Sequence, residues 1–487
     1  MFNFNNSVNK MSEKQILENE ILLFNSSQDR LWMVAGDKYY RSNNDINQRE
    51  ILKSLDSGGY EIDKSKANNK IAHGFMKNLV DEKIAYLLSK DYSLQCEDKT
   101  VIEKVKGALG KHFSYTLTGL GYAASNKGKA WLQVYIDEQG QFKTMIIPAE
   151  QCVPIWTDNN HVDLEGMIRY YNQVVYEGQT RKDVTKVEYW TAEGLQFFEL
   201  IDNKLVPDIE RLIEYGYTRE DFGDQLAHYK KGDEQRVWGK VPFICFKNNR
   251  IEYPDVRFVK SLVDNYDKSR SDVSNFLEDV KNLIYVLKNY GGEDLAEFMK
   301  DLNYYRAIKV DDDGGVDTLN PTLDISAAKE HYEQLKRDIN EFGQGVPKDL
   351  DKFGSSPSGI ALKFLYSGLD LKCNALEVEF KRGFEELLFF IQVYLSDSGQ
   401  GSFSNIDVDI IFNRDVKINE TETITNCVNS EGIVSDETIV ANHPWVKDVE
   451  EEIKKVAAEK QNKIKQQQDA FGLNIETQPN GSGVNGQ

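Results

Sequence analysis

The sequence lacks any apolar run near the ~20 residues that a membrane-spanning helix requires, so we expect no membrane partner. Residues Met1–Lys10 are rich in Asn and contain no apolar stretch, which indicates that no secretory signal is present. Only five cysteines occur in 487 residues, and they are far apart and odd in number. This pattern is typical of buried, reduced thiols in a cytoplasmic protein rather than of a disulfide framework or a zinc site.

Patterns that indicate catalysis are also scarce. The six histidines are scattered and form no H-x-H or H-x-x-x-H pair. Neither a G-x-S-x-G turn, a Walker loop nor a clustered pair of acids occurs in the sequence. We therefore predict a protein that is not an enzyme, with no catalytic residue, no cofactor and no metal site.

Two weak motifs carry alternative interpretations. Gly119, Gly121 and Ala124 match the dinucleotide-binding form G-x-G-x-x-A, which should follow a buried strand. The preceding residues are half polar, so a helix that uses its glycines for close packing is the stronger interpretation. The acids at Asp311–Asp313 are contiguous and precede two glycines, which suits a hairpin turn better than the spacing of a calcium loop.

The charge balance limits the partners that this chain can bind. The sequence has 79 acidic and 59 basic residues, a net charge of −20. A protein that grips nucleic acid is usually basic. Either DNA is no partner, or DNA must pass an acidic wall without being held, because such a wall repels phosphates. Simple solubility is the alternative explanation.

The first half of the chain predicts an α+β fold, with helices followed by antiparallel strands. Apolar periodicity and turn residues place the helices first and the strands from residue 130 onward. The expected helices are Ser12–Phe24, Ser27–Tyr40, Asn68–Ser89 and Thr100–Ala124. The expected strands are Trp131–Ile136, Phe142–Ile147, Gly166–Tyr171, Val184–Thr191, Gln196–Ile201 and Val241–Phe246, with a loop excursion over Ile209–Gln235.

Residues Asp255–Ser396 predict two one-sided helices around a small insert, then a loop and a very long helix, Gly359–Leu395. The first helix carries a polar band at Asp267, Lys268, Arg270 and Asp272. Unpaired charges are costly to bury, so we expect neighbouring copies to supply partners, with Arg270 facing Asp267 or Asp272. Two such helices indicate a protruding stalk rather than an enzyme pocket.

The insert and the loop are the segments of this region that indicate function. The insert predicts strands at Ile284–Leu287 and Ala307–Val310, a short helix over Glu293–Leu302 and a turn at Asp311–Gly315. The loop Gly343–Pro357 is longer than most helix–helix connections. Long loops on rigid helices tend to carry function, although an ordinary connector is an equal alternative. An isolated strand, Val408–Phe412, must then pair with an earlier segment.

In this order, several short motifs resemble the portal proteins of tailed double-stranded DNA bacteriophages of the long-tailed type. The motif that opens the long helix, Ser358–Lys363, is the most telling. The resemblance extends from about Leu31 to Glu459. The other matching stretches are Trp32, Gly36–Tyr40, Ile46, Arg49, Asn69–Ile71, Leu79–Asp81, Tyr86, Leu87, Ile168–Tyr171, Val241–Ile244, Asn248, Asn249, Leu262–Asp267, Ser274, Asn275, Glu278 and Asp279.

The resemblance implies a ring-forming portal fold: a mixed wing domain, a helical stem, a small α/β clip, a long kinked wing helix and a helical crown. The implied domains are 1–254 (wing), 255–282 (stem helix), 283–323 (clip), 324–342 (stem helix), 343–357 (tunnel loop), 358–418 (long helix and returning strand), 419–471 (crown) and 472–487 (flexible tail). Within these, a tunnel loop is expected to line the DNA channel through Val346, Lys348, Asp349, Leu350, Asp351, Lys352 and Phe353. A clip surface is expected at Tyr285, Ala307, Lys309 and Asp311.

The resemblance also implies partners and a location. Such proteins form rings, typically of twelve copies, at one capsid vertex of the virion after assembly in the host cytoplasm. The expected partners are double-stranded DNA passing through the channel, the terminase large subunit, a head–tail adaptor, the scaffold and the major capsid protein. A structural component of a phage-derived tail particle or prophage is the first alternative. A nucleotide-dependent DNA-processing enzyme is the second.

Overall fold

The computed structural model describes residues 11–221, 223, 225–279, 284–288, 294, 304, 315–319, 324–347, 359–401, 407–414, 420–446 and 449–470. The chain divides into two compact units. The first comprises Met1–Pro347 and Tyr366–Asp415, and the second comprises Lys348–Leu365 and Val416–Gln487. Helices and small antiparallel sheets occur together, so the predicted α+β class is confirmed.

The two N-terminal helices lie close to their predicted ranges, and each begins directly after a capping serine. Ser12 caps α1 (Glu13–Asn25) in a capping box with Gln15, and Ser27 caps α2 (Gln28–Tyr40). The apolar face of α1 packs on the β6–β10 sheet, because Leu17 and Ile21 are buried there. A 3₁₀ turn, η1 (Asp45–Gln48), follows α2 and leads into a hairpin of β1 (Leu52–Ser54) and β2 (Tyr60–Ile62).

Three helices form the middle of the first unit: α3 (Phe75–Leu88), α4 (Lys99–Leu109) and α5 (Phe113–Lys127). The helix expected from Asn68 begins only at Phe75, since the preceding residues run extended along another helix. The helix expected over Thr100–Ala124 is interrupted at Gly110, whose φ of +75° ends α4. Two sheets follow, with neighbouring strands antiparallel throughout.

The larger sheet has the order β10-β9-β8-β7-β6, and the smaller has β13-β4-β5. The predicted hairpin is confirmed, because Trp131 of β4 pairs with Ile147 of β5. The strands of these sheets are β4 (Lys129–Ile136), β5 (Phe142–Ile147), β6 (Cys152–Trp156), β7 (Leu164–Glu177), β8 (Thr180–Trp190), β9 (Leu195–Ile201), β10 (Lys204–Pro207) and β13 (Phe243–Lys247). The expected loop excursion contains α6 (Ile209–Glu214), η3 (Arg219–Asp221), β11 (Tyr229–Lys231) and β12 (Glu234–Arg236); η2 (Ala149–Gln151) precedes β6.

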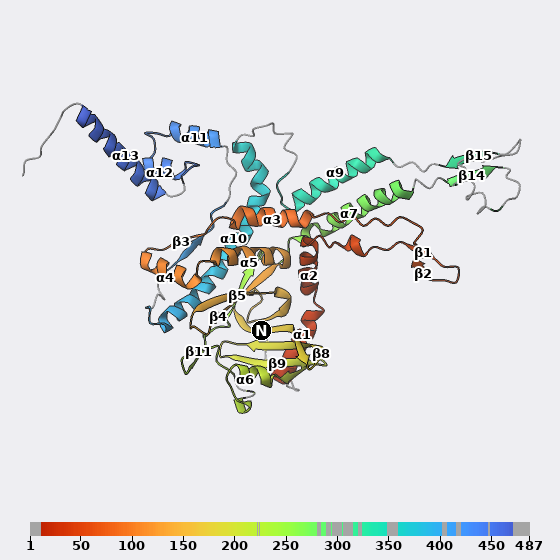
Figure 1. The fold of residues 1–487 in the computed structure, drawn as a ribbon, viewed down its shortest axis with the longest axis horizontal. Helices are drawn as coiled ribbons and strands as arrows, with labels where there is room; N and C mark the ends of the chain where they lie inside the picture. The colour runs from red at the N-terminus through yellow and green to blue at the C-terminus, as the bar shows by residue number, and fades with distance from the viewer. Residues whose placement is uncertain are drawn as a thin grey trace, which may run out of the picture. The chain divides into compact units, whose positions relative to one another are not determined.

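The long helix α10 (Gly359–Asp397) forms the spine of the main core. Phe380, Phe384 and Leu387 are buried against α5 and β13, as the ring of Phe246 beside Phe380 illustrates. The strand predicted over Val408–Phe412 is β16 (Asp409–Ile411), which pairs with β3 (Ser93–Gln95) and so returns to an earlier segment, as predicted. In Figure 1, α7 (Val256–Asp279) and α9 (Ile325–Phe342) run side by side.

The insert between α7 and α9 contains a hairpin with an unexpected second strand. β14 (Ile284–Lys288) lies where a strand was predicted, but it pairs with β15 (Gly315–Leu319), where no strand was expected. The strand predicted at Ala307–Val310, the helix predicted at Glu293–Leu302 and the acids Asp311–Asp313 fall outside the described residues, apart from isolated positions.

The second unit is helical in its described part. It contains α11 (Glu420–Asn429), α12 (Asp436–Ala441) and α13 (Val449–Ala470). Ser435 caps α12, a helix that the sequence did not predict, and Lys460 of α13 lies 3.7 Å from the carboxylate of Asp436. Among the described residues, no helix has the length and hydropathy needed to span a membrane.

Candidate functional site: the α7–α9 pair and its attachment

Each helix of the α7–α9 pair buries one stripe of side chains, and the two helices meet at Tyr332, whose hydroxyl donates to the carbonyl of Ser269 at 3.3 Å. In the first half of α7 this stripe is apolar, with Val256, Val259 and Val263 buried. On α9, Tyr332, Leu335 and Ile339 are buried at steps of three and four residues, as the periodicity predicted. Asp324 caps α9 by accepting a hydrogen bond from the backbone N–H of Ala327 at 2.9 Å.

The second half of α7 presents a polar ladder, which we define as Asp267, Ser271, Asn275 and Asp279. These side chains recur every four residues and bind the extended segment 67–73, which we name the strap. Its backbone N–H groups donate to Asp279 from Ala67 at 3.2 Å, to Asn275 from Asn69 at 2.6 Å, to Ser271 from Ile71 at 3.0 Å and to Asp267 from His73 at 3.1 Å.

The spacing of the ladder matches the spacing of the strap. Two residues of extended chain advance about 6.6 Å, and four residues of helix advance about 6 Å. Every second amide of the strap therefore meets every fourth side chain of α7. This match explains how α7 can bury Asp267, Ser271 and Asn275, each exposed by less than a tenth. Buried polar groups need such partners to be tolerated.

The polar band predicted on this helix is therefore satisfied differently from the expectation. Asp267 also accepts from Asn44 Nδ2 at 2.5 Å and lies 2.7 Å from His73 Nδ1, while Asp272 pairs with Arg49 at 2.5 Å. The expectation that neighbouring copies must supply these charge partners is wrong for both acids. Segment 44–73 of the same chain folds back to provide them, and helical periodicity alone does not reveal that return.

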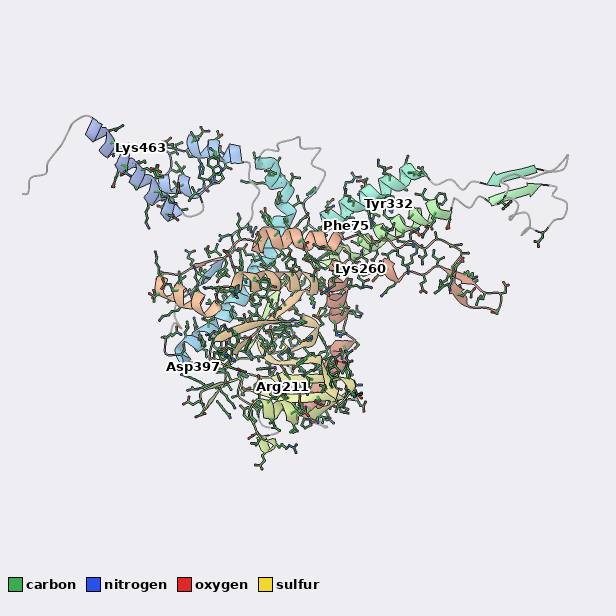
Figure 2. All side chains as sticks on the ribbon, in the orientation of Figure 1. Phe75, Arg211, Lys260, Tyr332, Asp397 and Lys463 are labelled. Atoms are coloured by element: carbon green, nitrogen blue, oxygen red, sulfur yellow. The ribbon has the colours of Figure 1, made fainter. Side chains whose placement is uncertain are left out.

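Arg270 and Lys268 lie on the exposed side of the band. Within one chain, the Arg270 guanidinium lies 5.0 Å from the centre of the Tyr332 ring, and its contact with Asp267 or Asp272 of a neighbouring copy stays a prediction. The rings of Phe75, Tyr266 and Tyr332 form a chain from α3 through α7 to α9, with centroids 4.9 and 6.0 Å apart. Figure 2 labels Phe75 and Tyr332 at its two ends.

A buried ionic cluster fixes the pair to the helices of the first unit. Asp255, directly before α7, accepts from Lys83 of α3 at 3.2 Å and pairs with Lys372 of α10 at 2.9 Å. Asn248 accepts from Lys83 at 2.5 Å and donates to Asp255 at 2.8 Å. Lys372 also donates to the carbonyl of Gly343 at the end of α9, at 3.0 Å. One cluster therefore joins the start of α7 and the end of α9 to α3 and α10.

The cluster shifts the pKa values of its members. Burial raises the pKa of the Asp255 carboxyl, but Lys372 and Lys83 outweigh it and lower that pKa to about 2. Burial lowers the pKa of Lys83 to about 8, although Asp255 opposes this shift. Removing one member would leave an uncompensated buried charge, so the cluster acts as a rigid joint.

The first residues of the expected tunnel loop pack on α3. A methyl group placed on Gly343 or Gly345 would lie 2.7 or 2.5 Å from the Leu79 side chain, so a larger residue at either position would have to displace that side chain. Val346 is partly buried against the core, and its N–H donates to Glu82 at 3.3 Å. Val346 thus has a packing role in this chain. The other predicted loop residues, Lys348, Asp349, Leu350, Asp351, Lys352 and Phe353, lie outside the described residues.

The predicted clip residues are only partly described. Tyr285 lies in β14 opposite Thr318 of β15. Ala307, Lys309 and Asp311 lie outside the described residues. Among the described residues of the insert, β14 and β15 pair with each other and with no third strand.

The weak nucleotide motif is a packing motif. Gly119 and Gly121 lie inside α5, which follows α4 and a turn rather than a strand. A methyl group on Gly121 would lie 2.5 Å from Leu88 and 2.9 Å from Ile84 of α3. Across the described positions, no group of three His, Cys, Asp or Glu side chains could hold a metal ion.

Sequence reasoning missed the polar ladder and the ionic cluster. A signal for the ladder was available, because Asp267, Ser271, Asn275 and Asp279 continue the apolar stripe of Val259 and Val263 at helical spacing. A polar continuation of a buried stripe indicates a polar partner, but it does not identify the strap. Lys83 and Lys372 gave no such signal, since each lies in a helix of mixed polar and apolar residues that does not mark it as buried.

Comparisons with known proteins agree over most of the chain. Residues 28–466 match the family model described as "Phage portal protein, SPP1 Gp6-like". The portal protein of Bacillus phage SPP1 is 32% identical over 430 residues, covering 88% of this chain and 83% of that protein. The portal protein of Clostridium phage phiCD119 is 33% identical over 442 residues, covering 88% of this chain and 92% of that protein.

A solved structure resembles this chain only distantly. A chain described as "Neck of native GTA particle computed with C12 symmetry" aligns with a TM-score of 0.39 and 10% sequence identity. The alignment covers 76% of this chain and 89% of that one. A likeness at this level carries no argument about function.

Proposed function

Because the chain belongs to the family of SPP1 Gp6-like phage portal proteins, we propose that it assembles into a closed ring at one vertex of a phage capsid. The ring surrounds a channel through which double-stranded DNA is packaged and later ejected. The match of the family model over residues 28–466 is the observation that carries this proposal. The role is structural rather than catalytic, which agrees with a site built from packing and ionic contacts.

In this proposal, α7 and α9 are the stem helices, within 255–282 and 324–342, and residues 1–254 form the wing. Residues 283–323 are the clip, 343–357 the tunnel loop and 358–418 the long helix with its returning strand. Residues 419–471 are the crown, and 472–487 follow it. The rigid joint at Asp255 supports the stem assignment, because a stem must keep its angle to the wing as DNA passes.

The acidic composition supports a channel through which DNA moves rather than binds. A net charge of −20 per copy repels phosphates, so a duplex meets few lasting contacts. Lys348 and Lys352 of the tunnel loop contact the phosphates of the passing DNA briefly, while Asp349 and Asp351 prevent the loop from binding the DNA tightly. The loop begins beside the packed residue Val346, so its base is fixed on α3.

The clip is the docking surface for the terminase and the head–tail adaptor. The β14–β15 hairpin supports this assignment, because open strand edges can pair with a strand of a partner. Replacing Ala307–Val310 by a strand-breaking sequence should spare the ring and abolish partner binding in a pull-down. Unchanged binding would contradict the assignment.

The proposed ring is tested by native mass spectrometry and negative-stain imaging of the purified chain. We expect a particle with a central hole and about twelve copies. Copies at −20 each repel one another, so low salt should loosen the ring. Monomers alone, at every salt and protein concentration, would overturn the proposal.

The loop is tested by replacing Lys348 and Lys352 with Glu in an assembling phage. DNA retention should fall while rings still form. The matched control replaces Lys99 and Lys106 of α4, which are exposed on the wing and change the charge equally. Equal retention by the two variants would show that the loop is a passive connector.

A further inference from the structure

Residues 49–66, which we name the arm, expose an apolar surface that nothing in the described chain covers. The arm is the β1–β2 hairpin with its flanks, and it turns at Gly58 and Gly59, whose φ angles are +83° and +101°. Its large apolar side chains are highly exposed, at 55% for Leu52, 74% for Tyr60 and 46% for Ile62. In Figure 1, β1 and β2 stand clear of the sheets of their unit.

The two faces of the arm differ in character. Leu52 pairs with Ile62, and Ser54 pairs with Tyr60, so these side chains share one face. On the opposite face, Lys53 and Glu61 form an ion pair at 2.8 Å. A lone two-stranded hairpin is marginally stable in water, and one with a bare apolar face is expected to be covered.

The base of the arm is held firmly, so its direction is set by α7. Asn68 donates to the carbonyl of Arg49 at 3.2 Å, and Lys70 donates to that of Asn47 at 3.2 Å, which clasps the two ends together. Arg49 reaches Asp272 of α7 at 2.5 Å, and the strap that follows the arm is bound along the polar ladder. A buried polar network therefore holds the base of the arm, whose apolar face is exposed.

We propose that the apolar face of the arm packs on the neighbouring copy of this chain and that this contact helps to close the ring. The inference rests on the ring proposed above. In a closed ring, each copy presents the same surface to the next, and a single ribbon can serve every interface. Charge favours an identical copy as the occupant: the arm, residues 49–66, contains four basic and four acidic residues and so adds no net charge to the contact, whereas the whole chain contains 59 and 79.

The test replaces Leu52, Tyr60 and Ile62 together with Ser. The matched control replaces Val174 and Tyr176, which are 44% and 69% exposed on the β7–β8 ribbon, with Ser. Ring formation is followed by native mass spectrometry across a dilution series. The arm variant should need at least tenfold more protein than the parent to reach half assembly, and the control should match the parent. Hydrogen exchange of the strap, unchanged in the arm variant, would show that its base remains folded.

A second measurement does not depend on a destabilising change. A photo-crosslinking phenylalanine analogue replaces Tyr60, and rings are assembled from equal amounts of ¹⁴N and ¹⁵N chains. Adducts that join a light and a heavy peptide would support the inference, whereas adducts within single copies alone would overturn it. Rings formed equally by the parent and the arm variant would overturn this inference and leave the proposed function standing. A parent chain that forms no ring would overturn the proposed function, and this inference with it.

Discussion

Replacing Asp267 with Ala should detach the strap from α7. The carboxylate is fully buried and receives three donors, namely Asn44 Nδ2, the backbone N–H of His73 and His73 Nδ1. The substitution leaves all three donors without their acceptor and removes no apolar contact of comparable size. Its effect therefore measures the polar ladder itself.

The expected magnitude follows from the number and kind of these contacts. A hydrogen bond to a charged group contributes about 1.5 to 3 kcal/mol, and removing one partner of a buried charged contact costs about 3 to 5 kcal/mol in total. The His73 side chain is 27% exposed, so water can satisfy its ring, which places the total within that range rather than above it. Ser271 makes one neutral contact, to Ile71, so Ser271→Ala should cost only about 0.5 to 1.5 kcal/mol.

Hydrogen exchange on the assembled protein is the appropriate assay, because it reports the free energy of local opening for each amide. In the parent chain, the amides of Ala67, Asn69, Ile71 and His73 should exchange slowly. In Asp267→Ala, exchange at His73 should accelerate by roughly 10² to 10³-fold or more, since about 1.4 kcal/mol corresponds to tenfold. Lys268→Ala, which changes an exposed neighbour, is the control and should leave these rates unchanged. If both variants exchange alike, the ladder does not hold the strap.

Three further predictions use the same structure. Arg270→Ala removes the guanidinium above Tyr332 and should lower stability by about 0.5 to 1 kcal/mol in denaturant unfolding, as for an exposed cation–π contact; a larger loss would indicate a buried role. The pKa of Asp255 is lowered to about 2, so the carboxylate stabilises the fold fully above the unfolded value of 3.8 and loses this effect as pH falls toward 2. The parent chain and Asp255→Asn should therefore differ less in unfolding free energy as pH falls through that window. A difference that stays constant with pH would refute the lowered pKa. Gly121→Ala should destabilise by about 1 to 3 kcal/mol through overpacking, whereas Gly107→Ala, with open space around it, should stabilise by about 0.5 to 1 kcal/mol; equal melting temperatures would contradict the packing role, and a rise with ATP would revive the nucleotide interpretation.

Local patterns predicted most elements of the first unit correctly. Apolar periodicity located α1 and α2, and alternating residues located the β4–β5 hairpin and β7, β8 and β9 of the larger sheet, whereas β6 and β10 were not predicted. Where an amphipathic pattern continued beyond the end of a helix, the predicted helix was too long. The helix expected from Asn68 is one example, since its first residues bind the polar ladder of α7 instead of forming helical hydrogen bonds.

The features of the candidate site also fall into those that the sequence predicted and those that it did not. The sequence alone determined that α7 and α9 are one-sided helices around an insert, because residues that recur every three and four positions lie on one face of a helix. It also determined the family, through motifs spread over most of the chain. Only the tertiary structure decided which groups satisfy the polar band.

The physical reason is separation along the chain. Asp267 meets His73 across 194 residues, and Lys83 meets Asp255 across 172. A carboxylate on the buried face of a helix needs a hydrogen-bond donor, because an unpaired buried charge is too costly. The sequence of the helix does not reveal whether that donor comes from the same chain or from a neighbour. Here the folded chain supplies the donors of the polar band itself, and it leaves the apolar face of the arm exposed.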